Sequence, residues 1–210
     1  MIKAVIFDID GVLVESEEFY MNRRMKFFKE LNIIPGSTDI NDFIGGNLDK
    51  NWEILVPNNE KLRKKLKDQY FKEFEPNNKI DFLKYSRRNL LKVFKFLKNR
   101  KIKIALASAG SVKNITAFIK SLNLEEYIEF FISGEKCLKN KPNPEIYIKS
   151  VKKLGLAKKE ILVVEDSKAG IEAAKNAGLT VLAFKITKYI VDQSLADYKI
   201  ADLEEIFEFI

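Results

Sequence analysis

Short apolar runs alternate with amphipathic stretches from residue 87 onward, and this pattern restricts the fold more than any other feature of the sequence. The runs are rich in β-branched residues, and between them apolar residues recur at helical spacing. The predicted strands cover 102–107, 130–132, 161–164 and 180–184, with a short one near Ile200. The predicted helices include one over 87–99, before the first of these strands, and a final one over 203–209. Such alternation predicts an α/β fold in which helices cover both faces of a parallel sheet. Uninterrupted apolar runs suit strands that are buried on both sides.

An earlier apolar run begins at Ile2, and we expect it to form the first strand of the same sheet. Residues 15–79 then show helical spacing and no convincing strand. A parallel crossover needs only about a dozen residues or slightly more, so this interval is far too long for one. We therefore predict an α/β core domain over 1–14 and 80–210, with an inserted helical domain over 15–79. Since the insert leaves the carboxyl end of the first strand, we expect it to cover that end as a cap.

Two carboxylates, Asp8 and Asp10, interrupt this first apolar run and are followed at once by Gly11. Side chains at positions i and i+2 of a strand lie on one face, so the two acids start out pointing the same way. A simple interpretation is an Asp-Gly turn with solvated carboxylates. That interpretation leaves unexplained why acids end a buried strand, where like charges repel and lose hydration. A divalent cation explains it, and we take these residues as the candidate active site.

The other predicted strands also end in polar residues. Ser108-Ala109-Gly110 follows the second strand, Lys141 lies in the loop after the third, and Glu165 with Asp166 ends the fourth. Each has an ordinary alternative, namely a helix N-cap, a surface lysine, or solvated acids. Ligands of open α/β sheets, however, bind beyond the carboxyl ends of the strands. Together these residues predict a site with carboxylates, a hydroxyl group, backbone N–H donors and an ammonium group.

The absence of histidine from all 210 residues narrows the possible chemistry. It excludes Ser-His-Asp and Cys-His catalysis and the usual zinc sites that contain histidine. The single cysteine, Cys137, has no histidine base and cannot form an internal disulfide, which suits a reducing cytoplasm. Any general acid or base must therefore be a carboxylate, a lysine or a tyrosine.

The charge of the chain bears on its partners. The net charge is +7, but the lysines are spread along the sequence and no aromatic-and-basic RNA-binding motif accompanies them. We expect no nucleic-acid partner, and a positive field that favours encounter with phosphorylated metabolites. No apolar run approaches the roughly 20 residues of a membrane span. We therefore expect no membrane partner, a cytoplasmic location without a signal peptide, and by default a monomer.

Four motifs occur in a fixed order along the chain. They are Asp8-Ile9-Asp10-Gly11-Val12-Leu13, then Ser108, then Lys141-Pro142-Asn143-Pro144-Glu145-Ile146-Tyr147, and finally Val163-Val164-Glu165-Asp166-Ser167. This set resembles the haloacid dehalogenase (HAD) superfamily, and more closely its β-phosphoglucomutase-like and phosphoglycolate-phosphatase-like members. The stretch from Ala169 to Gly178 is similar to the same group. The resemblance implies a Rossmann-like core, and the insert agrees in place and length with a small C1 helical cap.

The resemblance also implies a role for each acid. Asp8 is expected to be the nucleophile that forms an aspartyl-phosphate, and Asp10 the general acid that later serves as base. The Asp8 carboxylate, the Asp10 backbone carbonyl and the Asp166 carboxylate are expected to bind Mg²⁺. Glu165 is expected to lie behind them, paired with Lys141 or holding a water.

Phosphate binding is implied for the remaining motif residues. Ser108 and the N–H groups of Ala109 and Gly110 are expected to hold the phosphoryl oxygens at a helix N-terminus. Lys141 is expected to neutralise charge on the phosphoryl group and on Asp8. The implied activity is that of a Mg²⁺-dependent phosphatase of a small phosphorylated metabolite, since phosphoryl transfer rests mostly on positioning and electrostatics.

Other activities remain open at this point. A second aspartate at position 10 disfavours the dehalogenase branch. β-Phosphoglucomutases carry a cap histidine where Tyr20 stands and an arginine where Leu48 stands after Gly45, so hydrolysis is favoured over a sugar phosphomutase. Arg23 or Arg24 could bind substrate, although an exposed helix face is the simpler expectation. A non-enzymatic protein that accepts or binds phosphate is the further alternative.

Overall fold

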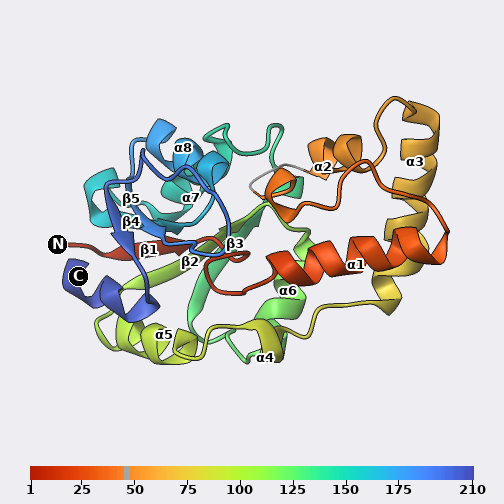
Figure 1. The fold of residues 1–210 in the computed structure, drawn as a ribbon. Coiled ribbons are helices and arrows are strands. Elements are labelled where there is room, and N and C mark those ends of the chain that lie inside the picture. The colour runs from red at the N-terminus through yellow and green to blue at the C-terminus, as the bar shows by residue number, and fades with distance from the viewer. Residues whose placement is uncertain (45–47) are drawn as a thin grey trace. The chain divides into compact units, whose positions relative to one another are not determined.

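The computed structural model describes residues 1–44 and 48–210, which form two compact units (Figure 1). The first unit contains Met1–Glu15 and Phe82–Ile210, and the second contains Ser16–Asp81. The chain therefore leaves the first unit after its first strand and returns to it at Phe82. Gly45, the glycine that precedes the position of the cap arginine in β-phosphoglucomutases, lies outside the described residues.

A six-stranded parallel sheet forms the centre of the first unit. Its strands are β1 (Ala4–Phe7), β2 (Lys103–Ser108), β3 (Ile128–Ser133), β4 (Ile161–Glu165), β5 (Thr180–Phe184) and β6 (Tyr198–Ile200). Their order in the sheet is β3-β2-β1-β4-β5-β6, and every neighbouring pair is parallel. The predicted α/β class is thus confirmed. β1 lies between β2 and β4, so its carboxyl end adjoins the ends of both.

The helices of the first unit connect these strands. They are α4 (Phe82–Tyr85), α5 (Leu90–Asn99), α6 (Val112–Ser121), α7 (Glu145–Leu154) and α8 (Lys168–Asn176), with 3₁₀ turns at Gly134–Lys136, Lys158–Glu160 and Leu203–Phe209. The helix expected over 87–99 begins only at Leu90, and Arg87 belongs to the segment that leads back into the sheet. The final helix predicted at 203–209 is a 3₁₀ helix.

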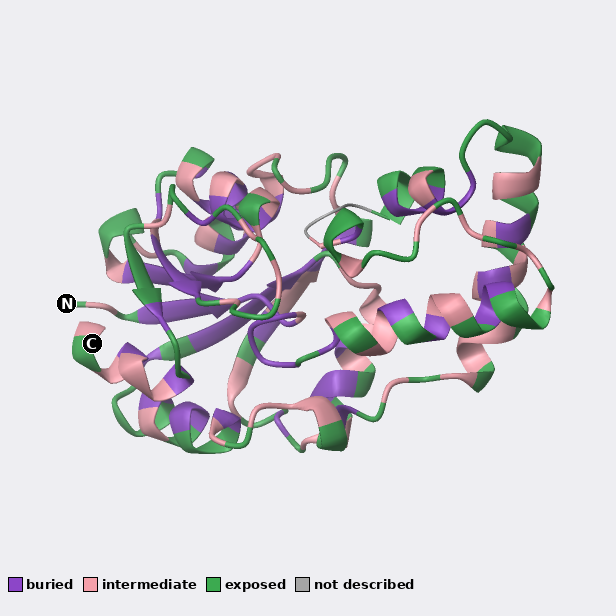
Figure 2. Cartoon of the chain, in the orientation of Figure 1, coloured by how far each residue is buried: buried purple, intermediate pink, exposed green. Residues whose placement is uncertain are grey.

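Alternate side chains of β1 face opposite layers of the first unit. Ala4 and Ile6 pack in one core cluster with Tyr147 of α7 and Ala173 of α8. Phe7 points to the other face, where its ring centroid lies 5.4 Å from that of Phe94 in α5. Both faces of the central strands are therefore buried, as the purple strands in Figure 2 show. This burial explains the continuous apolar runs of the sequence.

The second unit consists of helices and connecting loops, with no strand among its described residues. It contains α1 (Glu17–Glu30), α2 (Leu48–Leu55) and α3 (Glu60–Gln69), with a 3₁₀ turn at Ile40–Asp42, a π turn at Tyr70–Phe74 and a further 3₁₀ turn at Glu75–Asn77. A helical insert thus follows β1, as the sequence predicted. The short apolar run of the sequence at 52–56 lies mostly in α2.

An aromatic cluster forms the core of the second unit. The ring of Tyr70 lies 5.2 Å from that of Phe27 and 5.5 Å from that of Trp52, measured between centroids. Arg23 is buried beside it, donating to the Tyr70 hydroxyl at 2.7 Å and pairing with Glu75 at 2.7 Å. The expectation of an exposed face for Arg23 was therefore wrong, because its guanidinium group is buried against Tyr70 and Glu75.

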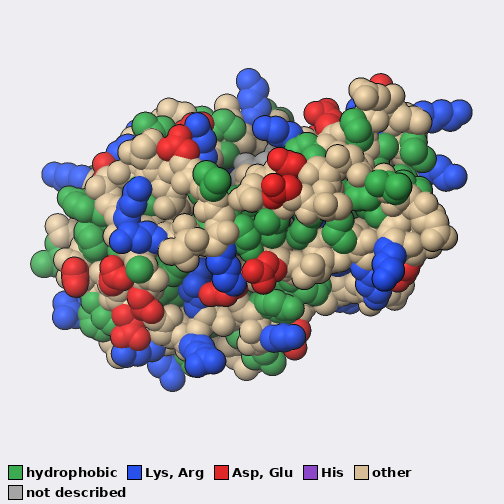
Figure 3. Space-filling model, in the orientation of Figure 1, with side chains coloured by type: hydrophobic (Ala, Val, Ile, Leu, Met, Phe, Trp, Pro, Cys, Tyr) green, Lys and Arg blue, Asp and Glu red, His purple; other side chains and the backbone are tan. Residues whose placement is uncertain are grey.

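The face of the molecule drawn in Figure 3 carries charges of both signs. On the face drawn in Figure 3, Lys and Arg side chains are scattered and Asp and Glu side chains lie among them. In the part of the chain that the structure describes, none of the helices has the length and apolar character that crossing a membrane requires.

Candidate active site

The loop that follows β1 is turned by a glycine. The Asp8 N–H continues the ladder by donating to the Val164 carbonyl at 3.0 Å, and the chain then turns at Gly11, whose φ is +81°. The Gly11 N–H donates to the Val14 carbonyl at 2.8 Å, which closes the turn. A Cβ atom on Gly11 would stand 2.0 Å from Oδ2 of Asp166. Only glycine therefore lets this loop pass against the Asp166 carboxylate.

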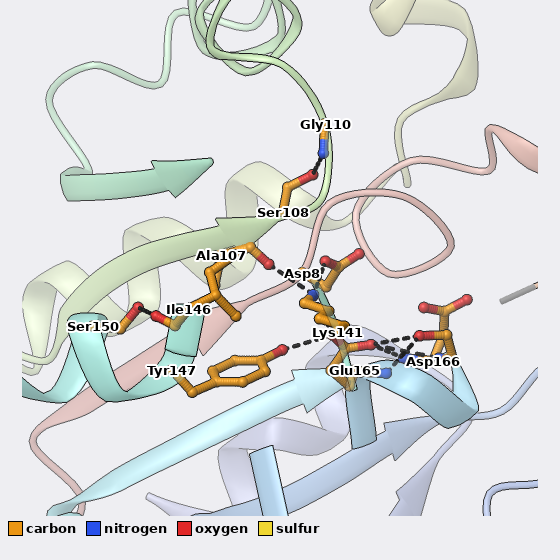
Figure 4. A network of polar contacts seen from close by, with 12 residues as sticks. Asp8, Ala107, Ser108, Gly110, Lys141, Ile146, Tyr147, Ser150, Glu165 and Asp166 are labelled. Carbon is orange, nitrogen blue, oxygen red and sulfur yellow. Dashed lines mark hydrogen bonds and ion pairs between the residues drawn. The ribbon is translucent and has the colours of Figure 1, made fainter. Parts of the chain in front are cut away.

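Three buried carboxylates meet at this edge of the sheet. Asp8, Glu165 and Asp166 each offer one oxygen, and these oxygens lie within 4.8 Å of one another. Lys141 reaches into the group from the loop between β3 and α7, as Figure 4 shows. Its Nζ lies 2.6 Å from Oδ1 of Asp8 and 2.5 Å from Oε1 of Glu165. Two neighbouring strand ends and a distant loop thus build one charged cluster.

The charges of this cluster do not balance. Burial raises the pKa of Asp8 well above its ordinary value, against the opposing effect of Lys141. Burial also disfavours the ammonium form of Lys141, but Asp8 and Glu165 outweigh it and hold the pKa of Lys141 well above its ordinary value. One ammonium group thus faces three carboxylates in a poorly hydrated place. Such an excess of buried negative charge is what a divalent cation offsets, and oxygen-only ligands suit Mg²⁺.

Glu165 is held by neighbouring donors on both of its oxygens. Oε1 accepts from the Tyr147 hydroxyl at 2.6 Å in addition to Lys141, and Oε2 accepts from the Asp166 N–H at 3.1 Å. A Cβ atom on Gly170 would come within 2.1 Å of the Glu165 carboxylate, so α8 can approach it only with glycine there. These contacts fix Glu165 as a support for its neighbours.

Tyr147 is a buried part of this network that the sequence reasoning did not single out as a site residue. The only signal was its place at the end of the Lys141–Tyr147 motif, because helical spacing alone makes it an ordinary core residue of α7.

Ser108 ends β2 next to Asp8's strand and is buried. Its Oγ accepts from the Gly110 N–H at 3.0 Å, and Ser133 donates to the Gly110 carbonyl at 2.6 Å. The N-cap of α6 is Ser111, whose Oγ accepts from the Asn114 N–H at 3.1 Å. The simple interpretation of Ser108 as the helix N-cap is therefore wrong.

The structure thus brings Asp8, Lys141, Glu165 and Asp166 into direct or near contact, whereas Asp10 has a different environment. Asp10 is partly exposed, and a bridge between its backbone and that of Val14 holds it in the loop. The two aspartates of the first motif therefore differ in burial.

Comparisons with known proteins identify the family of the chain. The model of the haloacid dehalogenase-like hydrolase family matches residues 5–184. The chain belongs to this family. Its HAD relatives include a phosphorylated carbohydrates phosphatase of Thermotoga maritima, 28% identical over 84% of this chain and 82% of that protein. The phosphoglycolate phosphatase of Aquifex aeolicus is 25% identical over 95% of this chain and 92% of that protein.

Solved HAD structures share the fold. A Haemophilus somnus protein whose phosphoglycolate phosphatase activity is predicted superposes with a TM-score of 0.83 at 23% identity, covering 99% of this chain and 97% of that one. The β-phosphoglucomutase of Clostridium difficile superposes with a TM-score of 0.79 at 21% identity, covering 100% and 95%. This chain is accordingly a HAD-family hydrolase related to phosphoglycolate phosphatases, and it shares its fold with a β-phosphoglucomutase.

Proposed function

We propose that this HAD-family hydrolase is a Mg²⁺-dependent phosphatase that acts on a small phosphomonoester through an aspartyl-phosphate on Asp8. The observation that carries the proposal is the buried Asp8 carboxylate with Lys141 at 2.6 Å and a second acidic strand end beside it. A carboxylate so placed is a nucleophile with an adjacent cation to stabilise the negative charge of an incoming phosphoryl group.

The cation would be held by the carboxylates of Asp8 and Asp166 and by the backbone carbonyl of Asp10. Glu165 is already occupied by Tyr147 and Lys141, so it supports this set from behind. When bound, Mg²⁺ supplies positive charge against the phosphoryl oxygens. Its hard, oxygen-only coordination matches the donors that these residues offer.

The protein's own groups account for the bond changes. An oxygen of Asp8 forms a bond to phosphorus while the ester P–O bond breaks, and Asp10 gives its proton to the departing oxygen. Asp10 then accepts a proton from a water whose oxygen attacks the phosphorus, which releases phosphate and regenerates the Asp8 carboxylate. Lys141 remains charged throughout, because its raised pKa keeps it protonated at neutral pH.

The phosphoryl oxygens would be bound by the turn between β2 and α6. The Ser108 hydroxyl and the N–H groups of Ala109 and Gly110 are the proposed donors, with Lys141 on the opposite side. Ser133 supports this turn through its hydrogen bond to the Gly110 carbonyl.

Sugar phosphates and similar phosphorylated metabolites are the proposed substrates, in keeping with the names of the Thermotoga and Aquifex relatives. Tyr20 and Leu48 stand where β-phosphoglucomutases have a histidine and an arginine, and this difference favours hydrolysis over isomerisation.

Phosphate release from p-nitrophenyl phosphate and from a panel of sugar phosphates in Mg²⁺ tests the proposal. We expect release by the wild type and loss of at least about 10³-fold in Asp8→Asn, since the nucleophile is removed. Interconversion of β-glucose 1-phosphate and glucose 6-phosphate without net phosphate release would instead establish a mutase.

A further inference from the structure

Arg87 makes an unusual set of contacts with the loop that carries Asp10. Its Nε donates to the Val12 carbonyl at 2.6 Å, and its Nη2 donates to the Gly11 carbonyl at 2.8 Å. Its Nη1 pairs with Glu15 at 2.9 Å. The guanidinium group thus spans the loop from the residue after Asp10 to the point where the chain leaves the first unit.

The backbone of Arg87 is tied to the same loop. The Arg87 N–H donates to the Leu13 carbonyl at 3.0 Å, and the Glu15 N–H donates to the Tyr85 carbonyl at 2.9 Å. Val14 and Ser86 form an antiparallel bridge between these contacts. The segment that returns to the first unit therefore runs alongside the segment that leaves it. Backbone hydrogen bonds alone already hold Arg87 beside the loop.

One face of the guanidinium group packs on an aromatic side chain from the sheet. Cζ of Arg87 lies 3.8 Å from the ring centroid of Phe184, the last residue of β5. The side-chain amide of buried Gln193 donates to the Phe184 carbonyl at 2.8 Å and to the Asp166 carbonyl at 2.6 Å. Arg87 is thereby packed against the same structure that holds the backbone of Asp166.

The loop that Arg87 holds determines where Asp10 stands. Asp10 is bridged to Val14, and the Gly11 N–H donates to the Val14 carbonyl. A general acid must lie within hydrogen-bonding distance of the atom it protonates, and an error of about 1 Å can cost about 10²-fold in rate. A planar guanidinium group can donate to two adjacent carbonyls at once, which a lysine cannot do.

We propose that Arg87 is a positioning residue, which holds Asp10 where it can protonate the leaving group. The inference rests on the proposed phosphatase function. In the step concerned, the Asp8–phosphorus bond forms, the ester P–O bond breaks, and the Asp10 proton passes to the departing oxygen. A displaced Asp10 slows this step most when the departing oxygen is strongly basic.

Two aryl phosphates that differ in leaving-group basicity test this directly. p-Nitrophenolate departs readily without a proton, whereas phenolate needs one more strongly. kcat/KM reports the steps up to leaving-group departure, so dephosphorylation does not mask the comparison. We expect Arg87→Ala to lower kcat/KM about tenfold more for phenyl phosphate than for p-nitrophenyl phosphate. Asp10→Asn should show the same bias more strongly.

The control is Arg88→Ala, which removes an exposed arginine one residue away. We expect it to change neither value more than about twofold. Arg87→Lys keeps the charge but loses the planar group that donates to two carbonyls at once. We therefore expect it to restore only part of the wild-type ratio of the two kcat/KM values. A wild-type ratio in Arg87→Lys would show that the charge alone is sufficient, and it would overturn the proposed positioning by the guanidinium group.

A purely structural role for Arg87 predicts a different result. A smaller folded fraction lowers both kcat/KM values by one factor, and an unchanged ratio in Arg87→Ala would therefore refute the inference. If that variant does not fold, Phe184→Leu removes the stacking surface and should show a smaller bias of the same sign. If Asp10→Asn shows the bias and the Arg87 and Phe184 variants do not, the result refutes only this inference. A wild type without phosphatase activity would refute the proposed function as well.

Discussion

At the scale of single residues, the site is governed by how Lys141 balances the carboxylates around it. Its Nζ contacts Asp8 and Glu165 in a place where all three side chains are shielded from water. A buried charge that loses its partner keeps its desolvation penalty, which is why removing one member of such a pair costs far more than a surface ion pair.

Replacing Lys141 with alanine should therefore destabilise the protein as well as inactivate it. We expect a loss of about 3 kcal/mol in the free energy of unfolding at neutral pH without Mg²⁺, measured by urea denaturation. Lys149→Ala breaks a partly exposed ion pair with Glu145 and should cost less than about 1 kcal/mol. Equal losses in the two variants would contradict the buried network.

The pH dependence of this contribution has a defined sign. The pKa of Lys141 is raised on folding, because Asp8 and Glu165 outweigh burial. Its stabilising effect is therefore complete below the ordinary lysine pKa and is lost as the pH rises through the higher folded value. The stability gap between wild type and Lys141→Ala should therefore not narrow between neutral pH and about pH 9, and narrowing within that range would count against the network.

Tyr147 supports the same cluster with a single hydrogen bond. Tyr147→Phe removes the donor to Glu165 and leaves the buried carboxylate less satisfied. We expect a loss of about 1.5–3 kcal/mol in the free energy of unfolding, as for a hydrogen bond to a charged group. Tyr198→Phe, at an exposed position, should have almost no effect. An unchanged stability in Tyr147→Phe would mean that Glu165 does not depend on it.

At the scale of elements, two glycines allow loops and helices to approach the carboxylates closely. Gly170 lets α8 lie against Glu165, and Gly11 lets the loop after β1 lie against Asp166. Alanine is the better helix former by about 1 kcal/mol, so propensity alone predicts that Gly170→Ala stabilises α8.

The close approach predicts the opposite result for Gly170→Ala. A Cβ atom 2.1 Å from the Glu165 carboxylate forces that side chain to move, so we expect lower stability and a loss of at least tenfold in kcat. Gly155→Ala is the matched control, since its φ is +66° but nothing lies within 4 Å of the added atom. It should cost about 1 kcal/mol and leave kcat unchanged. A fully active Gly170→Ala would show that Glu165 need not stay fixed.

Sequence reasoning succeeded where each element carries its own pattern. The strands of the first unit could be predicted from their apolar runs, and the acids expected at one edge of the sheet do lie together there. Arg87 was expected inside a helix, because apolar spacing gives no sign that the helix begins only at Leu90. Its partners Gly11 and Val12 lie more than seventy positions away in the chain, and no local pattern encodes such contacts.

The same limit explains the surprises in the second unit. Arg23 is a charged residue of α1, and its partners in the buried core are Tyr70 and Glu75 from the far end of the insert. The helix α2 shows too few apolar residues to reveal its period, with Trp52 and Leu55 as its fully buried apolar members.

At the scale of the whole molecule, the proposed cation would join two strand ends and so stabilise the first unit. A ligand that binds only the folded state adds about 2.7 kcal/mol at 100 times its Kd. We expect the melting temperature to rise with Mg²⁺ concentration, and Asp166→Asn to abolish the rise. Asp68→Asn, at an exposed position in α3, should retain it. A rise that persists in Asp166→Asn would place the cation elsewhere.

The account as a whole depends on Asp8 as the phosphoryl acceptor, and acid-quenched turnover measures this most directly. The enzyme is mixed with p-nitrophenyl phosphate and Mg²⁺, quenched within milliseconds, and examined by intact-mass and peptide mass spectrometry. We predict one added phosphoryl group on the peptide that contains Asp8, absent in Asp8→Asn. Turnover with an unmodified Asp8 peptide, or a phosphoryl group on another residue, would contradict it.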